Sequence, residues 1–196
     1  MLQIQLCRVF LVLAGQWIKL YTLYQKGNLL KSLVDIRSVG TTELDLLWGL
    51  FTEYHNEVSA YSGERPLPLK EQFKTFWGNQ DKHSVILYSG SEPIGFSLMQ
   101  CVVSTNNYKY LEVGAIFVKK KHRRGYNGLK LYKAVLDYGI KLNLPIGSEI
   151  SEDNTASISI ARSLAKRNIR RRKKGVLKET SLNNGRYFIV YYNANK

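Results

Sequence analysis

The stretch from residue 112 to residue 142 constrains the fold more than any other part of the chain. Its first seven residues, Glu112 to Val118, are mostly β-branched, aromatic or small, which predicts a buried strand. A basic loop with glycines at positions 125 and 128 follows. Apolar residues then recur at three- and four-residue spacing up to position 140, as on one face of an amphipathic helix. The sequence therefore predicts a strand, a glycine-containing loop and a helix in direct succession.

Such a succession can hold a phosphate group. Unpaired amides at the start of the helix face the loop, and the helix dipole adds roughly half a positive charge there. Gly125 and Gly128 let the backbone approach an anion closely, and Arg123 and Arg124 can add charge-assisted hydrogen bonds. The chain contains neither Gly-x-x-x-x-Gly-Lys-Ser/Thr nor Gly-x-Gly-x-x-Gly, so a P-loop and a Rossmann dinucleotide loop are both excluded.

The stretch resembles the acetyl-CoA loop of the GNAT acyltransferase superfamily. In that family a strand ends in Val, an Arg follows five residues later, and Arg-x-x-Gly-x-Gly/Ala opens a helix; Val118, Arg123 and Gly128 match this pattern. Tyr126 stands where the family has its middle glycine, and Gly125 gives the shifted form Arg-x-Gly-x-x-Gly. The resemblance implies an acetyl-CoA site formed by the residues Ile116, Phe117, Val118, Arg123, Arg124, Gly125, Tyr126, Asn127 and Gly128.

Two further residues match positions that have roles in the superfamily. Glu112, six positions before Val118, resembles the general base of the histone-acetyltransferase branch; a charged residue at the solvent end of a strand is the alternative interpretation. Asn154 resembles an asparagine that contacts the pantetheine arm, although an asparagine that caps a helix needs no ligand. The tyrosine acid of the superfamily has no match, because Ala161 or Leu164 occupies its place, so the general acid is unassigned.

The remaining elements follow the order of the superfamily. We expect strands over residues 33–39, 84–89, 94–103, 108–118, 145–150 and 185–192. Helices are expected from position 41 or 42, over residues 69–77, and from Asn154 to near Asn168, with the basic run 170–174 as a loop. The resemblance implies an α/β (α+β) fold whose mixed, mostly antiparallel central sheet is flanked by helices, over residues 34–196.

Residues 1–33 form an N-terminal extension of unknown role. They contain four basic residues and no acid, and their apolar run from Val9 to Gly15 is far short of the ~20 residues that span a bilayer. No transmembrane segment is therefore expected. A signal peptide is poorly supported, since Arg8 lies inside the first apolar run; a packed helix or strand, a membrane-surface segment and a spurious upstream start stay open.

The distribution of charge indicates which classes of partner suit the chain, and its cysteine content indicates the cellular compartment. Residues 113–196 hold five acids and nineteen bases, and a positive field there suits either coenzyme A or a nucleic acid. Cys7 and Cys101 lie far apart and the three histidines are scattered, which predicts a reducing, cytoplasmic compartment and no metal.

The resemblance implies an N-acetyltransferase that moves the acetyl group of acetyl-CoA to an unidentified amine acceptor. The alternatives are a basic nucleic-acid-binding module and a catalytically silent GNAT fold.

Overall fold

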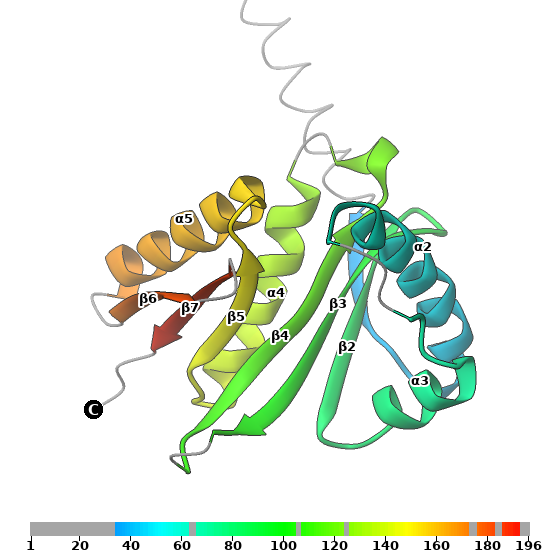
Figure 1. The fold of residues 1–196 in the computed structure, drawn as a ribbon, viewed down its shortest axis with the longest axis horizontal. Helices are drawn as coiled ribbons and strands as arrows, with labels where there is room; N and C mark the ends of the chain where they lie inside the picture. The colour runs from blue at the N-terminus through cyan, green and yellow to red at the C-terminus, as the bar shows by residue number, and fades with distance from the viewer. Residues whose placement is uncertain are drawn as a thin grey trace, which may run out of the picture.

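One mixed sheet runs through the described part of the chain, in the strand order β1-β2-β3-β4-β5-β7-β6 (Figure 1). The structure, a computed structural model, describes residues 34–62, 66–104, 107–123, 126–172, 176–182 and 186–192. The predicted extension over residues 1–33 lies outside the described residues, as do Arg124 and Gly125. The strands are β1 (Val34–Ser38), β2 (Lys82–Ser89), β3 (Glu92–Val103), β4 (Lys109–Val118), β5 (Ile146–Ser151), β6 (Val176–Leu182) and β7 (Arg186–Tyr192).

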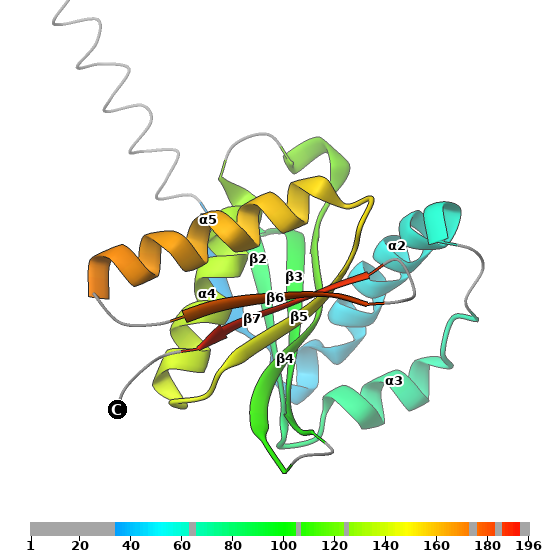
Figure 2. The ribbon, with the colours of Figure 1, turned by 60° about the vertical axis from the view of Figure 1, so that its left-hand side comes forward.

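Helices cover both faces of this sheet. The α-helices are α2 (Leu44–Ser62), α3 (Lys70–Trp77), α4 (Asn127–Lys141) and α5 (Thr155–Arg172), and two 3-10 turns, η1 (Thr41–Glu43) and η2 (Lys120–His122), precede α2 and α4. Helices α2 and α3 lie on one face, whereas α4 lies on the other (Figures 1 and 2). Helix α5 packs against the block formed by β5, β7 and β6 and runs alongside its strands (Figure 2). The expected mixed, mostly antiparallel sheet flanked by helices is confirmed.

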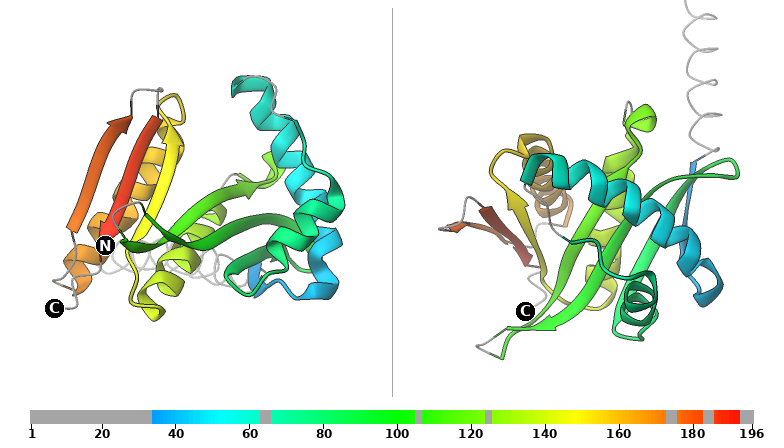
Figure 3. Two further views of the ribbon diagram at one scale, coloured as in Figure 1. Left: turned by 60° about the horizontal axis from the view of Figure 1, so that its bottom comes forward. Right: turned by 45° about the vertical axis from the view of Figure 1, so that its right-hand side comes forward.

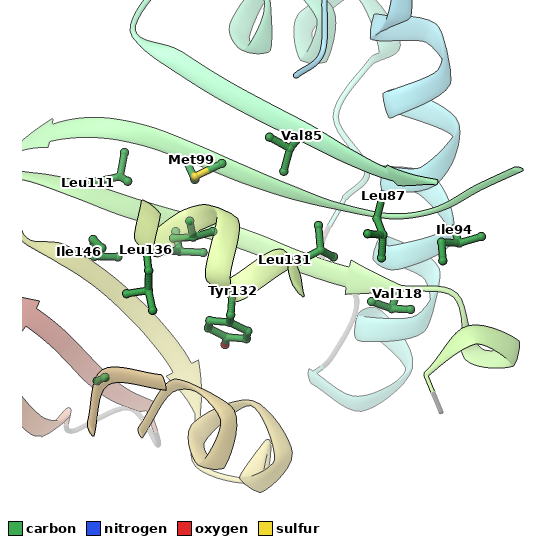
Figure 4. Packing of buried hydrophobic residues seen from close by; sticks show 13 residues of the cluster. Val85, Leu87, Ile94, Met99, Leu111, Val118, Leu131, Tyr132, Leu136 and Ile146 are labelled. Atoms are coloured by element: carbon green, nitrogen blue, oxygen red, sulfur yellow. The ribbon is translucent and has the colours of Figure 1, made fainter. Parts of the chain in front are cut away.

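Two apolar clusters hold the layers together because the strands alternate their side chains between the two faces. On one face, Leu131 of α4 packs against Met99 of β3 and Leu111 of β4 (Figure 4). Val135 of α4 belongs to the same cluster, and all four residues are buried. The cluster on the opposite face joins α2 and α3 to the same strands; its buried members are Leu44, Leu47, Leu50, Phe73, Ile86, Tyr88, Phe96, Leu98, Ala115 and Phe117.

A β-bulge in β4 changes which residues face which helices. Leu98 of β3 pairs with Ala115, whereas the next residue, Met99, pairs with Val113, so Gly114 is the additional residue in β4. Val113 packs with α4 before the bulge, and Ala115 packs with α2 and α3 directly after it. A bulge bends its strand and increases the local twist. Here it lies at the point where β4 leaves its neighbour β5.

The sheet divides into two blocks beyond this bulge. Strands β4 and β5 run parallel and pair over three positions, from Leu111↔Ile146 to Val113↔Ser148. Past that point β4 continues against β3 up to Val118, while β5 continues against β7 up to Ser151. The left view of Figure 3 shows the two blocks diverging. We call this point, where pairing between β4 and β5 ends, the fork.

Two details differ from the sequence-based expectations. Helix α5 continues to Arg172, so the first part of the basic run 170–174 is helical and the expected loop was wrong there. Arginine is a good helix former, which explains why the helix does not end near Asn168. Strand β6, which the sequence pattern did not predict, pairs with β7 and forms the last hairpin of the sheet.

Candidate active site

The open side of β4 begins at the fork. The backbone groups of successive strand residues point alternately to the two sides, so those of Ile116 and Val118 point to the same side of β4. The carbonyl of Val118 accepts a hydrogen bond from Arg123 Nε at 2.8 Å, on the side away from β3. Ile116 therefore presents its N–H and C=O on the side from which β5 has diverged. An extended ligand that carries amides could pair with this edge as an added strand.

The N-terminus of α4 lies beyond the end of β4. Its N-cap residue, Tyr126, makes no side-chain capping hydrogen bond, and its ring is exposed. The first intrahelical bond runs from Lys130 N to Tyr126 O, so the amides of Asn127, Gly128 and Leu129 precede the helical ladder. The Asn127 side chain donates to the carbonyl of His122 at 2.9 Å and ties the helix to η2. Backbone amides without a side-chain cap are suited to an anion.

Gly128 brings α4 close to α5. A Cβ at this position would lie 3.9 Å from Cδ1 of Ile160, which is an ordinary van der Waals distance. Nearby, the Tyr132 hydroxyl of α4 forms a hydrogen bond with Ser157 of α5, and burial raises the pKa of Tyr132 to about 12. The two helix starts are thus joined on one side of the fork by a packed, largely apolar contact with one polar bond.

Arg123 contacts the protein itself in this structure. Besides its bond to Val118, its Nη2 donates to Glu57 Oε2 of α2 at 2.5 Å, and its guanidinium lies 5.7 Å from the ring centroid of Phe117. Lys119 pairs with Glu53 of α2 at 3.3 Å in the same way. The acids of the first half of the chain therefore offset part of the positive charge of the loop. Phosphate contacts by Arg123 stay a prediction.

Glu112 lies on β4, two residues before the bulge, on the face covered by α2 and α3. It is half-buried, and one of its oxygens, Oε2, accepts a hydrogen bond from Gln100 Nε2 of β3. Its neighbour on the same face is Tyr110, whose pKa is raised by burial first and then by the carboxylates of Glu112 and Glu149. Glu112 is therefore not an isolated charge at a solvent end of the strand. Its catalytic role stays a prediction.

Asn154 has the structural role that its sequence position indicates. Its Oδ1 accepts a hydrogen bond from Ser157 N at 3.1 Å, and its backbone carbonyl accepts one from Ile158 N at the same distance. These contacts make it the N-cap of α5. The side chain is exposed, and contact with a pantetheine arm stays a prediction.

Trp77, which the sequence pattern did not single out, lies against the bulge. Its Cη2 atom is 3.6 Å from where a Cβ of Gly114 would lie, and Phe76 packs edge-on against it at 5.2 Å between ring centroids. The end of α3 therefore places aromatic rings at the bulge, two residues after Glu112. The apolar spacing of residues 69–77 predicted a helix, but periodicity alone does not indicate which strand the helix covers.

A hollow of about 390 Å³ lies along one side of α5. It is lined by Ser159 and Ser163, together with Thr155, Arg162 and Lys166. Arg162 is bound to Glu179 of β6 through its Nε at 2.9 Å and its Nη2 at 2.6 Å. Nothing in these contacts assigns a general acid.

The described residues contain neither a cluster of metal-binding side chains nor a helix that could span a membrane. No three His, Cys, Asp or Glu side chains within the described ranges come together as metal ligands would. None of the helices in the described part of the chain combines the length and apolar character that crossing a membrane requires.

Several solved structures share this fold. A putative acetyltransferase from Salmonella typhimurium, yncA, solved with its cofactor acetyl-CoA, is 12% identical over 84% of this chain and 95% of its own, with a TM-score of 0.64. NAA60 from Arabidopsis thaliana, in complex with a bisubstrate analogue, is 16% identical over 83% of this chain and 98% of its own, with a TM-score of 0.57. An aminoglycoside acetyltransferase from an uncultured soil metagenomic sample, in complex with sisomicin, is 12% identical over 68% of this chain and 88% of its own, again with a TM-score of 0.57.

Comparison of the sequence itself identifies the family. A search of curated protein sequences finds no significant match. The profile of the Acetyltransferase (GNAT) family, however, matches residues 45–165, which run from the start of α2 into α5 and include the fork, the loop and the start of α4. This match spans more than half of the 196 residues. The chain therefore belongs to the Acetyltransferase (GNAT) family.

Proposed function

We propose that this protein is an N-acetyltransferase that moves the acetyl group of acetyl-CoA directly to an amine acceptor, with Glu112 as the general base. The observation that carries the proposal is the position of Glu112 on β4 at the fork, two residues before the bulge. Three neighbours of similar fold support it: yncA was solved with acetyl-CoA, NAA60 with a bisubstrate analogue, and the soil enzyme with sisomicin.

In this proposal the cofactor extends from the start of α4 to the fork. Its pyrophosphate accepts hydrogen bonds from the first amides of α4, including that of Gly128, and its pantetheine amides pair with the open edge at Ile116 and Val118. A backbone N–H of this edge then polarises the acetyl carbonyl. Arg123, Tyr126 and Asn127 shape the described part of the loop, and Asn154 lies at the opposite side of the fork. Roles of Arg124 and Gly125 in binding the cofactor stay a prediction from the sequence.

The chemical step is a single displacement. The amine nitrogen attacks the carbonyl carbon, one N–H proton passes to the Glu112 carboxylate, and the C–S bond breaks with its electron pair on sulfur. The thiolate then takes a proton from water. Cys101 is not used as a nucleophile, because the described residues place no histidine in hydrogen-bond contact with it.

Binding is tested first, by calorimetric titration with acetyl-CoA, coenzyme A and ATP. The proposal is supported if acetyl-CoA and coenzyme A bind with micromolar Kd while ATP binds weakly. Gly128→Asp should abolish the binding of acetyl-CoA and coenzyme A, since a carboxylate at the helix start repels an anion. Absence of binding at millimolar acetyl-CoA refutes the proposal.

Turnover is tested next, by the release of coenzyme A thiol with sisomicin, spermidine, and peptides that offer either a free α-amine or a lysine. Glu112→Gln is expected to lower kcat by about 10² to 10⁴, the usual contribution of a positioned general base, while the Kd of acetyl-CoA is kept. Asp137→Asn makes the same change at an exposed position of α4 and is the matched control. Equal rates for wild type and Glu112→Gln would show that Glu112 is not the base, and absence of turnover despite cofactor binding would favour a catalytically silent fold.

A nucleic-acid-binding role gains no support from the described residues. Lys119, Lys121 and Arg123 of the basic loop are each paired with a glutamate.

A further inference from the structure

A row of three polar side chains crosses the sheet and ends at Glu112. Lys82 of β2 is the register partner of Gln100 on β3, and Gln100 is the register partner of Glu112 on β4. Lys82 Nζ donates to Gln100 Oε1 at 2.6 Å, and Gln100 Nε2 donates to Glu112 Oε2. The row lies on the face covered by α2 and α3, where apolar residues otherwise dominate.

The chemistry of the two ends determines how the amide in the middle is oriented. The ammonium of Lys82 has three donors and no acceptor, so the Gln100 atom that faces it must be the oxygen. The amide nitrogen then necessarily faces Glu112, whose ionised carboxylate only accepts. Both neighbours therefore require the same orientation of the Gln100 amide. A glutamine without such neighbours would have no contact that distinguishes its oxygen from its nitrogen.

Lys82 is itself held in place from the other side. Its ammonium lies 4.3 Å from the ring centroid of Phe76 on α3, within the range of a cation–π contact. Phe76 packs against Trp77, the residue beside the bulge. The row is therefore fixed to α3 at one end and to the fork at the other.

We propose that Gln100 and Lys82 are positioning residues that aim the Glu112 carboxylate at the acceptor. The proposal rests on the proposed function, in which Glu112 is the base. Gln100 holds Oε2 toward β3 and leaves Oε1 as the oxygen that takes the amine proton. Lys82 acts one step further away by preventing the Gln100 amide from turning over.

Kinetics test the proposal with the acceptor that gives the highest rate among sisomicin, spermidine and the two peptides. A misplacement of about 1 Å in a catalytic group costs up to roughly 10² in rate, so Gln100→Leu is expected to lower kcat about 10- to 100-fold. Lys82→Met is expected to lower it about 3- to 10-fold, with Lys82→Arg restoring most of the loss because it keeps a donor. The KM for acetyl-CoA stays within about twofold, since the row does not touch the cofactor edge. Lys109→Met, the same change at an exposed position of β4, is the matched control.

A double-mutant comparison separates positioning from general damage to the fold. In the Glu112→Gln background, Gln100→Leu and Lys82→Met are expected to have less than about a twofold further effect, because the group that they aim is gone. Full additivity of the losses would overturn the proposal. If Gln100→Leu does not fold, the isosteric Gln100→Glu replaces it; it removes the donor, sets a second carboxylate beside Glu112, and is expected to lose at least as much activity.

Nuclear magnetic resonance tests the row without any acceptor. The two side-chain amide protons of Gln100 are assigned by their loss in Gln100→Leu. The proton donated to Glu112 is expected to lie downfield of its usual position and to be protected from exchange with water, and in Lys82→Met it is expected to move toward the usual position and to exchange faster. Amide protons of Gln100 at the usual shifts and without exchange protection in the wild type would overturn the proposal even if the enzyme is active. An ordered amide in a protein that binds no acetyl-CoA would instead refute the proposed function and leave the row as a structural feature, so the two failures are distinguishable.

Discussion

Replacing Gly95 by alanine is expected to strain the sheet where β4 ends. Gly95 of β3 pairs with Val118, and it is buried. A Cβ at this position would lie 2.4 Å from the carbonyl oxygen of Phe117 and 3.2 Å from Cα of Val118. Carbon and oxygen in contact lie about 3.3 Å apart, so the end of β4 would have to retreat by about 0.9 Å.

The loss of stability depends on which atoms the new Cβ meets, here the Phe117 carbonyl oxygen and the Val118 Cα. Both are backbone atoms, which cannot rotate away as a side chain can, so the upper end of the usual range for overpacking, about 3 kcal/mol, applies. Removing a glycine from a strand returns about 0.5 to 1 kcal/mol through the lower entropy of the unfolded chain. We therefore expect Gly95→Ala to lower the free energy of unfolding by about 2 kcal/mol.

Urea unfolding measures this difference, and Gly49→Ala provides the matched control. Gly49 is exposed within α2, and a Cβ there would meet no atom within 4 Å. The same substitution should therefore stabilise the protein by up to about 1 kcal/mol. The shift in β4 should also weaken acetyl-CoA binding in Gly95→Ala and leave it unchanged in Gly49→Ala. Equal stability of Gly95→Ala and wild type would refute the argument.

Three further predictions concern charges and protons. Glu57→Gln should strengthen acetyl-CoA binding by up to about fivefold in calorimetry, because it frees Arg123 from a partly exposed ion pair; weaker binding would show that the pair organises the loop. The folded protein keeps the Tyr132 proton up to a pKa of about 12, and the unfolded chain releases it near 10. The folded state thus binds more protons than the unfolded chain between pH 10 and 12. The free energy of unfolding of the wild type should therefore fall over this range by up to about 2.7 kcal/mol more than that of Tyr132→Phe. Equal falls in the two proteins would contradict this. Burial and, after it, the charge of Lys141 lower the pKa of His83. The unfolded chain therefore binds more protons as the pH drops below about 6.5, so the free energy of unfolding should fall there. In urea unfolding between pH 7 and 5, His83→Phe should show a smaller fall than wild type, because it keeps a ring against Tyr138 but has no group to titrate.

Local patterns were sufficient for most of the elements and for their order, with β6 as the exception. Strand β4 and helix α4 were predicted because periodicity and glycine positions are properties of a short stretch. The family resemblance supplied the mixed, mostly antiparallel sheet flanked by helices. The predicted end of α5 was wrong because the basic run 170–174 predicts a loop, whereas the helix continues to Arg172, in keeping with the good helix propensity of arginine.

Contacts between distant residues were beyond the reach of such patterns. Glu57 and Arg123 are 66 positions apart, so nothing local indicates that they pair. The bulge at Gly114 depends on how β3 and β4 align, and a one-residue shift would turn the side chains to the other face. Gln100 likewise has no distinguishing sequence signal. Its partners become visible only when the register of three strands is known.

The short pairing between β4 and β5 leaves the sheet without hydrogen bonds between these two strands beyond the fork. Three positions join the block of β1 to β4 to the block of β5, β7 and β6. A ligand that pairs with the open edge of β4 would continue the ladder and bridge the two blocks. Such a ligand stabilises the folded state by about 2.7 kcal/mol at a free concentration of one hundred times its Kd. Resistance to heat should therefore report cofactor binding directly, before any acceptor is known.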